Sequence, residues 1–165
     1  MPFLYRALAV ALPLFLAAGC ASDGPDDSAT GSSSADASAS EVSGYSSDIS
    51  STELLGAEGS TILDQLIAYP ETGQAEITAG IIEIPPGVET GWHFHEVPLF
   101  VYVLSGTVTV TYDTDNGEVT KAYSSGEPLL EAIGTHHNGR NEGDEPVRLI
   151  AVYMGADGSA NVVKL

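Results

Sequence analysis

The sequence predicts an all-β domain, built as a closed barrel or jelly roll, behind an N-terminal segment that is not part of the fold. Turn-forming residues are abundant, with 18 Gly and 9 Pro in 165 residues. Eight short runs rich in Val, Ile, Thr and Tyr alternate with turn signals in the later part of the chain. No long segment has the 3.6-residue period of an amphipathic helix. That many strands in about 114 residues fit a closed structure better than an open sheet.

The first 19 residues are predicted to be an export signal. Arg6 supplies the positive charge of the n-region, and Ala7–Ala18 is apolar except for Pro13. This stretch of about twelve residues matches a signal h-region and is too short to span a bilayer core of roughly 30 Å.

The end of this signal resembles the lipobox of bacterial lipoproteins, on the residues Leu16-Ala17-Ala18-Gly19-Cys20. The lipobox prefers Leu, Val or Ile where this chain has Ala17, and its Leu lies one step earlier. The resemblance implies cleavage before Cys20, lipidation of that cysteine and anchoring to the bacterial cell envelope without a membrane helix. Because no Asp follows Cys20, the resemblance favours the outer membrane or an outer leaflet. The alternative is a plain secretory signal in which Cys20 is incidental.

Residues 20–51 are rich in Ser, Ala, Asp and Gly and are predicted to be a disordered acidic linker. Large apolar residues are almost absent before Ile49, so the segment cannot bury enough surface to offset its ordering entropy. The linker would lift the domain off the membrane. The alternative is that part of it docks as an N-terminal strand.

Composition excludes several classes of function. The chain has 23 acidic and 5 basic residues, a net charge of −18, which repels phosphate backbones and excludes nucleic-acid binding. Its single cysteine excludes an intramolecular disulfide and a Cys-rich zinc site, and lipidation would leave no thiolate nucleophile. Serine-hydrolase, dinucleotide and P-loop motifs are absent from the sequence.

Residues 52–165 are predicted to form the folded domain. A hairpin is expected across the turn at 113–118, and a short helix is expected near Glu53–Gly56. The predicted strands are the β-branched and aromatic runs Ile62–Ala68, Ala75–Ile84, Leu99–Leu104, Thr107–Tyr112, Val119–Tyr123, Leu129–Ile133, Val147–Met154 and Asn161–Val163.

All four histidines fall in two pairs, His93 with His95 and His136 with His137. Alternate side chains of a strand share a face, so the imidazoles of His93 and His95 point the same way and can chelate a divalent metal. A third imidazole from another strand would complete a set with open positions. The alternative for the first pair is an exposed or hydrogen-bonded pair of histidines.

Two motifs make a family resemblance specific. The segment Gly87-x5-His93-x-His95-x3-Leu99-x6-Gly106 is similar to the first cupin motif, G-x5-H-x-H-x3,4-E-x6-G. The second cupin motif, G-x5-P-x-G-x2-H-x3-N, is matched by Gly126-x5-Ala132-x-Gly134-x2-His137-x3-Asn141.

The resemblance implies a double-stranded β-helix (jelly-roll) barrel that is often a homodimer. It also implies a divalent metal ion (Fe, Mn, Zn, Ni or Cu) held by His93, His95 and His137 inside the barrel. The family contains dioxygenases, isomerases, lyases and non-catalytic binders.

Two positions depart from the family pattern. Leu99 replaces the metal-binding Glu, and Ala132 replaces a Pro. Either three histidines bind the metal with water, or another carboxylate replaces the missing one, or the barrel carries no metal. Glu131 is the candidate carboxylate because it interrupts an apolar run, where a charge is costly unless paired or coordinated; the alternative is an outward position on a solvated face. Glu96 is expected to face away from the site.

Two further residues are candidates for catalysis. His136 is expected in the second shell or as a general acid or base at the pocket rim, and its alternative is a surface position. Arg140 is one of few cations and could hold a substrate carboxylate or enolate oxygen. The alternative for Arg140 is an ion pair with Glu142 or Asp144.

The sequence therefore predicts an envelope-anchored metalloprotein that takes a small oxygen-rich or aromatic molecule. One reading is an enzyme of dioxygenase, isomerase or lyase type. The other is a non-catalytic lipoprotein that binds a small ligand or a metal.

Overall fold

The computed structural model describes residues 48–165, which form two facing antiparallel β-sheets and contain no helix. The nine strands are β1 (Ala75–Ile84), β2 (His93–Phe94), β3 (Leu99–Ser105), β4 (Thr107–Thr114), β5 (Gly117–Ser124), β6 (Pro128–Leu130), β7 (His137–Arg140), β8 (Val147–Ala156) and β9 (Val163–Lys164). The all-β jelly-roll fold predicted from the sequence is confirmed.

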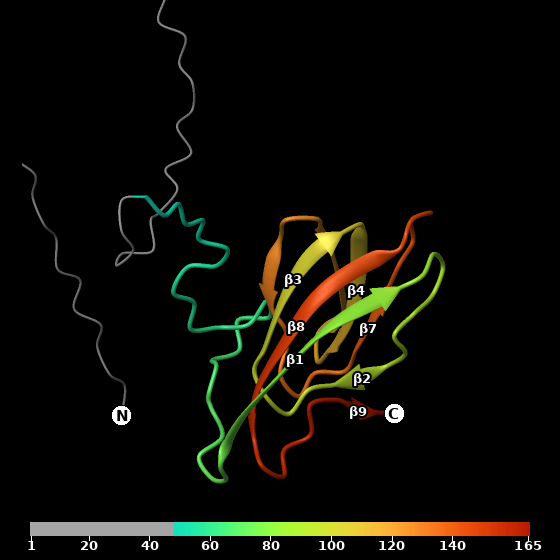
Figure 1. The fold of residues 1–165 in the computed structure, drawn as a ribbon. Helices are drawn as coiled ribbons and strands as arrows, with labels where there is room; N and C mark the ends of the chain where they lie inside the picture. The colour runs from blue at the N-terminus through green and yellow to red at the C-terminus, as the bar shows by residue number, and fades with distance from the viewer. Residues whose placement is uncertain (1–47) are drawn as a thin grey trace, which may run out of the picture. The chain divides into compact units, whose positions relative to one another are not determined.

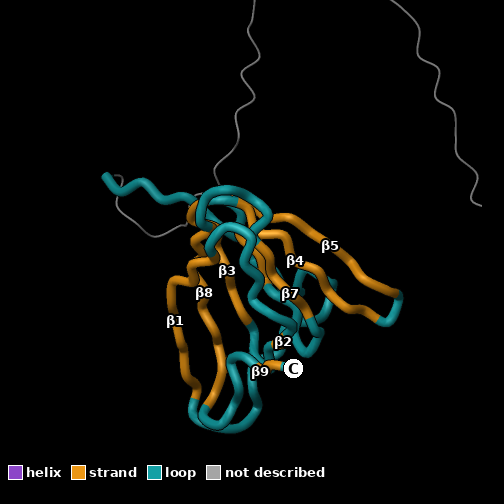
Figure 2. Tube along the Cα trace, turned by 90° about the vertical axis from the view of Figure 1, so that its right-hand side faces the viewer, coloured by secondary structure: helices purple, strands orange, loops and turns teal. Residues whose placement is uncertain are grey.

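The two sheets are built from strands that are far apart in the chain (Figure 1). One sheet has the order β1-β8-β3-β6 and the other β5-β4-β7-β2-β9. Figure 2 shows them side by side as two layers, with β1, β8 and β3 in one and β4, β5 and β7 in the other. Because non-consecutive strands are neighbours, short segments such as β2 and β7 are brought together, with His93 directly opposite His137.

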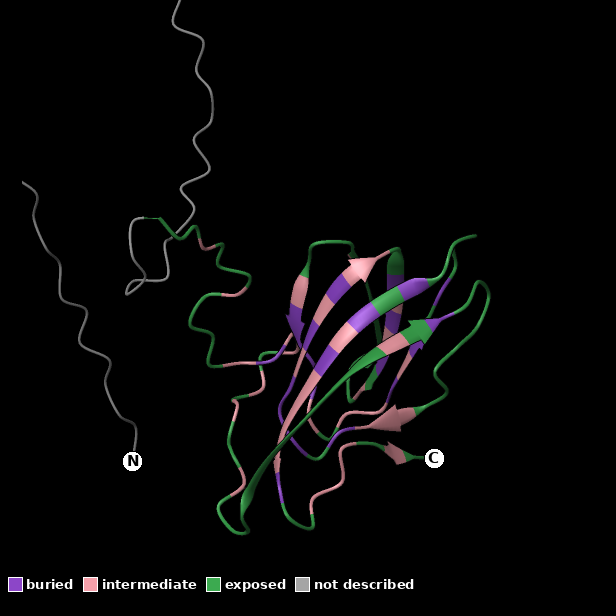
Figure 3. Ribbon diagram, in the orientation of Figure 1, coloured by how far each residue is buried: buried purple, intermediate pink, exposed green. Residues whose placement is uncertain are grey.

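The core lies between the sheets and follows the two-residue period of the strands. In β3, buried Leu99, Val101 and Val103 alternate with less buried residues, and β4 buries Val108, Val110 and Tyr112 in the same way (Figure 3). In these two strands, every second side chain therefore lies inside the sandwich.

Most predicted strands are present, and β1 has the predicted bounds. The predicted strand Ile62–Ala68 is wrong. This segment is a loop closed by a bridge between Ser60 and Leu66, in which the hydroxyl of Thr61 accepts hydrogen bonds from two backbone N–H groups. Local side-chain bonding of this kind competes with strand pairing, and Asp64 has a φ of 60°.

Three smaller expectations also change. The short helix near Glu53–Gly56 is wrong, since these residues form bends only. In the run Leu129–Ile133 the strand ends at Leu130, although Ile133 forms an isolated bridge with His95. The last strand is Val163–Lys164 rather than Asn161–Val163. The strands β2 and β7 were not predicted as separate strands.

The predictions for residues 1–47, including the signal and Cys20, lie outside the described residues. Within residues 48–165, no helix has the length and apolar character needed to cross a membrane.

Candidate metal centre

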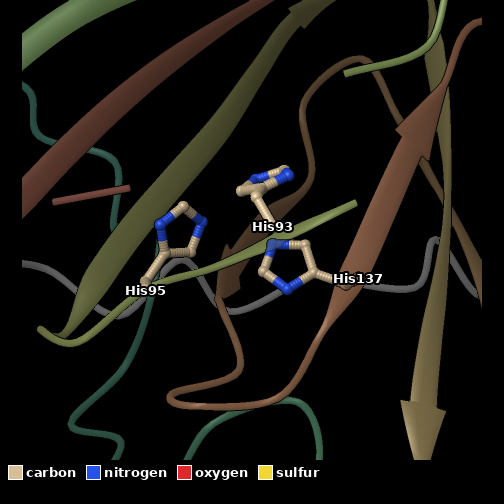
Figure 4. Close-up of side chains that lie close together, drawn as sticks. All are labelled: His93, His95 and His137. Carbon is tan, nitrogen blue, oxygen red and sulfur yellow. The ribbon is translucent and has the colours of Figure 1, made fainter. Parts of the chain in front are cut away.

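Three imidazoles converge inside the sandwich, as Figure 4 shows. The nitrogen atoms that His93, His95 and His137 offer as ligands lie within 4.8 Å of one another. His93 comes from β2, His95 from the segment just after it, and His137 from β7. His95 and His137 are buried, at 3% and 2% exposure, and His93 is half-buried. The convergence predicted from the two histidine pairs is present for these three residues.

Backbone carbonyls fix the tautomer of all three rings. The Nδ1–H of His93 donates to the carbonyl of Gly91 (2.7 Å), that of His95 to Asn161 (2.6 Å) and that of His137 to Thr135 (2.9 Å). With Nδ1 protonated, a neutral imidazole keeps its lone pair on Nε2. The three rings are thus held in the orientation and tautomer that metal-binding histidines use.

Burial keeps these rings neutral. Desolvation is the main cause that lowers the pKa of His95 to about 4, and it also lowers the pKa values of His93 and His137. Repulsion between charged imidazolium groups lowers these pKa values further. His137 lowers the pKa values of His93 and His95, and His93 lowers that of His95. At neutral pH the cluster therefore offers unprotonated donors, which metal binding requires.

The histidines line a cavity of about 70 Å³ between the two sheets. Its other walls are largely apolar and come from β1, β3, β4 and β8, with Ile82, Leu99, Val110 and Leu149 among them. Tyr153 packs its ring edge-on against His95 at a centroid distance of 5.6 Å, and Tyr112 packs against His137 at the same distance. The space admits an ion with a few water molecules or a very small part of a ligand.

Glu131 faces into this cavity, and the outward alternative is wrong. The residue is 6% exposed, lines the cavity and accepts a hydrogen bond from the backbone of Ala132 (2.9 Å). Its backbone N–H donates to the carbonyl of Leu99, so the two residues are neighbours across β3 and the end of β6. Desolvation raises the pKa of the Glu131 carboxyl. A carboxyl group thus lies beside the position where Leu99 removes one.

The structure corrects the expected place of His136. It does not line the histidine cavity but a separate hollow of about 790 Å³, together with Asp113, Lys121 and Thr135. Its ring packs against Phe94 at 5.4 Å. Neighbouring residues of an extended chain point to opposite sides, so an inward His137 directs His136 outward.

The expected roles of Arg140 also change. Arg140 lies at the end of β7, is exposed and does not line the cavity. Its Nε lies 3.7 Å from the Oε1 of Glu89, rather than pairing with Glu142 or Asp144. Glu96, in contrast, is exposed as expected and accepts a hydrogen bond from the backbone of Ala160 (2.8 Å).

Sequence reasoning missed Gln65, which anchors the segment carrying Glu131 and His137. Its Nε2 donates to the carbonyl of Ile133 (2.8 Å) and the hydroxyl of Thr135 (3.0 Å), and its Oε1 accepts from the backbone of Ile133 (3.0 Å). Thr135 in turn holds the ring of His137. Gln65 lies in the segment expected to be a strand, so no local pattern pointed to this role.

Substituting Gln65 by Ala is expected to lower the free energy of unfolding by about 1–3 kcal/mol, because the backbone groups of Ile133 lose their partners. We expect metal affinity to fall by about tenfold as well, because the loop that orients His137 loosens. Urea denaturation and metal titration measure the two effects. Gln74→Ala is the matched control, since this exposed glutamine makes no side-chain hydrogen bond among the described residues; equal effects of both substitutions would contradict the role.

The metal-free chain is expected to lose stability as pH falls from 6.5 toward 4. An unfolded His95 takes up a proton near pH 6.5, whereas the folded residue, with its pKa of about 4, does so only near pH 4. Between these values the unfolded state binds the extra proton; above pH 6.5 neither state does. Relative to a His95→Gln variant, the wild-type free energy of unfolding should fall by on the order of 3 kcal/mol from pH 7 to pH 4. Chemical denaturation in the presence of a chelator measures it, and a parallel pH dependence of both proteins would refute it.

The donor set fits a divalent ion. Three neutral nitrogen donors, each ordered by a carbonyl on its second nitrogen, suit Zn, Cu, Fe and Ni, and they leave coordination positions open. Among residues 48–165, no fully buried side-chain N or O atom lacks a hydrogen-bond partner.

Comparison with known proteins shows that the part of the chain carrying these features is similar to a known family. Residues 80–153, which include all three histidines, match the family model described as "Cupin domain". No curated protein matches the chain in sequence.

Several solved structures are similar to this chain. The oxalate decarboxylase of Lactobacillus farciminis, in a formate complex, has a TM-score of 0.49 and 26% identity, covering 56% of this chain and 27% of that chain. BH2720 from Bacillus halodurans has a TM-score of 0.45 and 24% identity, covering 53% and 69%. Vicilin from Corylus avellana (hazelnut) has a TM-score of 0.47 and 14% identity, covering 53% and 25%. The match thus spans less than a third of the length of the oxalate decarboxylase.

Proposed function

Because residues 80–153 of this chain form a cupin domain, we propose that His93, His95 and His137 bind one divalent metal ion inside it and that the ion acts on or holds a small molecule. The observation that carries the proposal is the set of three Nδ1–H···O=C hydrogen bonds, which leave three Nε2 lone pairs in one buried cluster. A cluster with no ligand to bind would have no need for three neutral, oriented and mutually close imidazoles.

When bound, the metal would supply a Lewis acid at the bottom of an apolar cavity. The residues of the chain determine the shape and polarity of the space around the metal. Apolar walls, such as Leu99 and Val110, surround the site, and the phenol of Tyr153 lies at the cavity wall beside His95. These properties favour a small oxygen-rich or aromatic molecule over a large one, and chemistry of the dioxygenase, isomerase or lyase type.

We infer that Glu131 supplies a carboxyl group beside the metal site, where Leu99 has none. Leu99 and Glu131 are neighbours across β3 and the end of β6, and both line the cavity. The carboxyl group of this chain therefore lies one strand away from the position at which the cupin motif has its Glu. Among the described residues, the group of close potential ligands comprises the three histidines and not Glu131. We therefore propose Glu131 as an acid or base beside the metal rather than as a ligand; burial raises the pKa of its carboxyl group.

Elemental analysis of the purified full chain tests the metal site, and a substrate panel then tests activity. About one equivalent of Fe or Mn with consumption of O₂ or turnover of a small acid or phenol would support the enzyme. A chain with no bound divalent metal after growth in supplemented medium would overturn the proposal.

The competing function is a non-catalytic binder. The small volume of the cavity and the apolar Leu99 in place of a charged ligand favour it. Tight binding of Zn or Cu, with no turnover across the same panel, would establish this function instead.

We also propose that Cys20 is lipidated and anchors the domain to the cell envelope, with the acidic linker as a spacer. Detergent phase partitioning of the chain expressed in a bacterium tests this. Wild type should enter the detergent phase and Cys20→Ser the aqueous phase; aqueous partitioning of both would disprove lipidation.

A homodimer is proposed from the outer face of the β1-β8-β3-β6 sheet. Side chains of β1 alternate between its two faces, and Ile82 and Ile84 line the cavity. Ile77 and Ile81 therefore point outward, and they are 74% and 59% exposed. The strand register places Ile81 beside Ile150, and Ile150 beside Tyr102, so the patch is apolar across three strands. Light scattering of wild type and Ile81→Lys tests it, since only the wild type should dimerise.

A further inference from the structure

A second hollow adjoins the histidine cavity and opens outward from it. It has a volume of about 360 Å³ and shares His93, Thr90, Ile82, Ile84 and Tyr153 with the cavity wall. Its remaining walls come from the end of β1, the loop before β2, and β9. Since five residues border both spaces, a molecule reaching the histidines by this route passes through the outer hollow, which we call the vestibule.

The vestibule contains one uncompensated positive charge. Its two carboxylates are each within reach of an arginine: Arg148 Nε lies 3.8 Å from Glu83 Oε2, and Arg140 Nε lies 3.7 Å from Glu89 Oε1. Lys164 also lines the vestibule, and among residues 48–165 its ammonium group has no ion-pair partner.

Lys164 is placed there by strand pairing. It lies on β9 directly opposite His93 of β2, so it belongs to the wall that holds a proposed metal ligand. After burial, which is the main cause, the charge of Lys164 is one of the influences that lower the pKa of His93.

Resting on the proposed function of the histidine site, we propose that Lys164 binds the carboxylate of a small organic acid in the vestibule, while the body of the acid packs against the apolar vestibule walls beside the histidines. An ammonium group supplies three donors and a full charge to such an anion. Lys164 is then a specificity-determining residue, and the class of ligand is a monocarboxylate with an apolar or aromatic body.

The acidic charge of the chain and the apolar walls of the vestibule both favour a monocarboxylate with an apolar or aromatic body. The described residues carry 18 acidic and 4 basic side chains, so a dianion such as a phosphate monoester would be repelled more strongly than a monoanion. Ile82, Ile84, Val88 and Val162 supply apolar walls, on which the body of the acid can bury surface.

Benzoate and its neutral isostere benzamide are the probes for this proposal. Binding to the purified full chain is measured by ligand-observed NMR, with and without bound metal, for wild type, Lys164→Gln and Lys121→Gln. Lys121 lies on β5 and lines another hollow, so its substitution removes the same charge away from the vestibule. Lys164→Gln is expected to weaken benzoate about three- to tenfold and leave benzamide unchanged, whereas Lys121→Gln changes neither.

A Lys164→Glu variant gives a second, independent readout. It should exclude benzoate and bind benzylamine better than wild type does, since the sign of the charge is reversed. Equal benzoate binding by wild type and Lys164→Gln would overturn the proposal, because the carboxylate would then be held elsewhere, including by the metal itself. Metal content measured on the same samples separates the two proposals. If metal is bound but wild type and Lys164→Gln bind benzoate equally, only the proposal for Lys164 fails. If no metal is bound but Lys164→Gln still weakens benzoate binding, only the proposal for the metal site fails.

Discussion

His137→Ala is expected to abolish binding of divalent metal by this chain. His137 is buried at 2% exposure, and its Nε2 is one of only three close donors in the described cluster. Removing it leaves two imidazoles and an apolar gap, which cannot compensate the desolvation of an ion. We expect affinity to fall by more than about a hundredfold, beyond the effect typical of outer-shell substitutions.

The adjacent histidine supplies a matched control. His136→Ala removes the same side chain one position earlier, from a residue that precedes β7 and lines another hollow. Elemental analysis and isothermal titration with Mn²⁺ and Zn²⁺ should show stoichiometric metal for His136→Ala and none for His137→Ala. Full metal content in His137→Ala would show that this histidine is not a ligand.

Gly106→Ala is expected to cause a large loss of stability, although the residue lies outside the site. Gly106 joins β3 to β4 with a φ of 76°, a conformation that costs other residues about 1–2 kcal/mol. A Cβ atom there would also lie 2.9 Å from Val147 Cγ2 and 3.1 Å from Val147 Cα, so buried Val147 and its backbone would have to move. Strain and overpacking together should lower the free energy of unfolding by about 2–4 kcal/mol.

Gly126→Ala isolates the conformational part of this effect. Gly126 also has a positive φ, 91°, but a Cβ atom there meets nothing within 4 Å. Urea denaturation should show a loss of about 1 kcal/mol for Gly126→Ala and a clearly larger one for Gly106→Ala. If the two losses are equal, contact with Val147 contributes nothing and the packing argument fails.

Most of the fold follows from local sequence. The run Ala75–Ile84 is rich in β-branched residues and lies between turn signals, and the structure has a strand with the same bounds. The exceptions have local causes as well. Ile62–Ala68 has the composition of a strand, but Thr61 and Asp64 favour a turn, and the two-residue strand β2 is too short to show any period.

The site is only partly predictable in this way. The spacing of His93 and His95 indicates one face of an extended segment, and the second motif supplies His137 at the matching place. The run Leu129-Leu130-Glu131-Ala132-Ile133 is apolar on both sides of the glutamate, so its sequence does not reveal which way Glu131 points.

The sequence by itself determined the all-β class, most of the strands and the three histidines, because each depends on residue type and on a spacing within one segment. Only the tertiary structure decided that Glu131 turns inward beside Leu99, that Arg140 pairs with Glu89 and that Lys164 stands opposite His93. Those contacts join segments tens of residues apart, and the order in which strands pair, rather than any local period, sets which distant side chains meet.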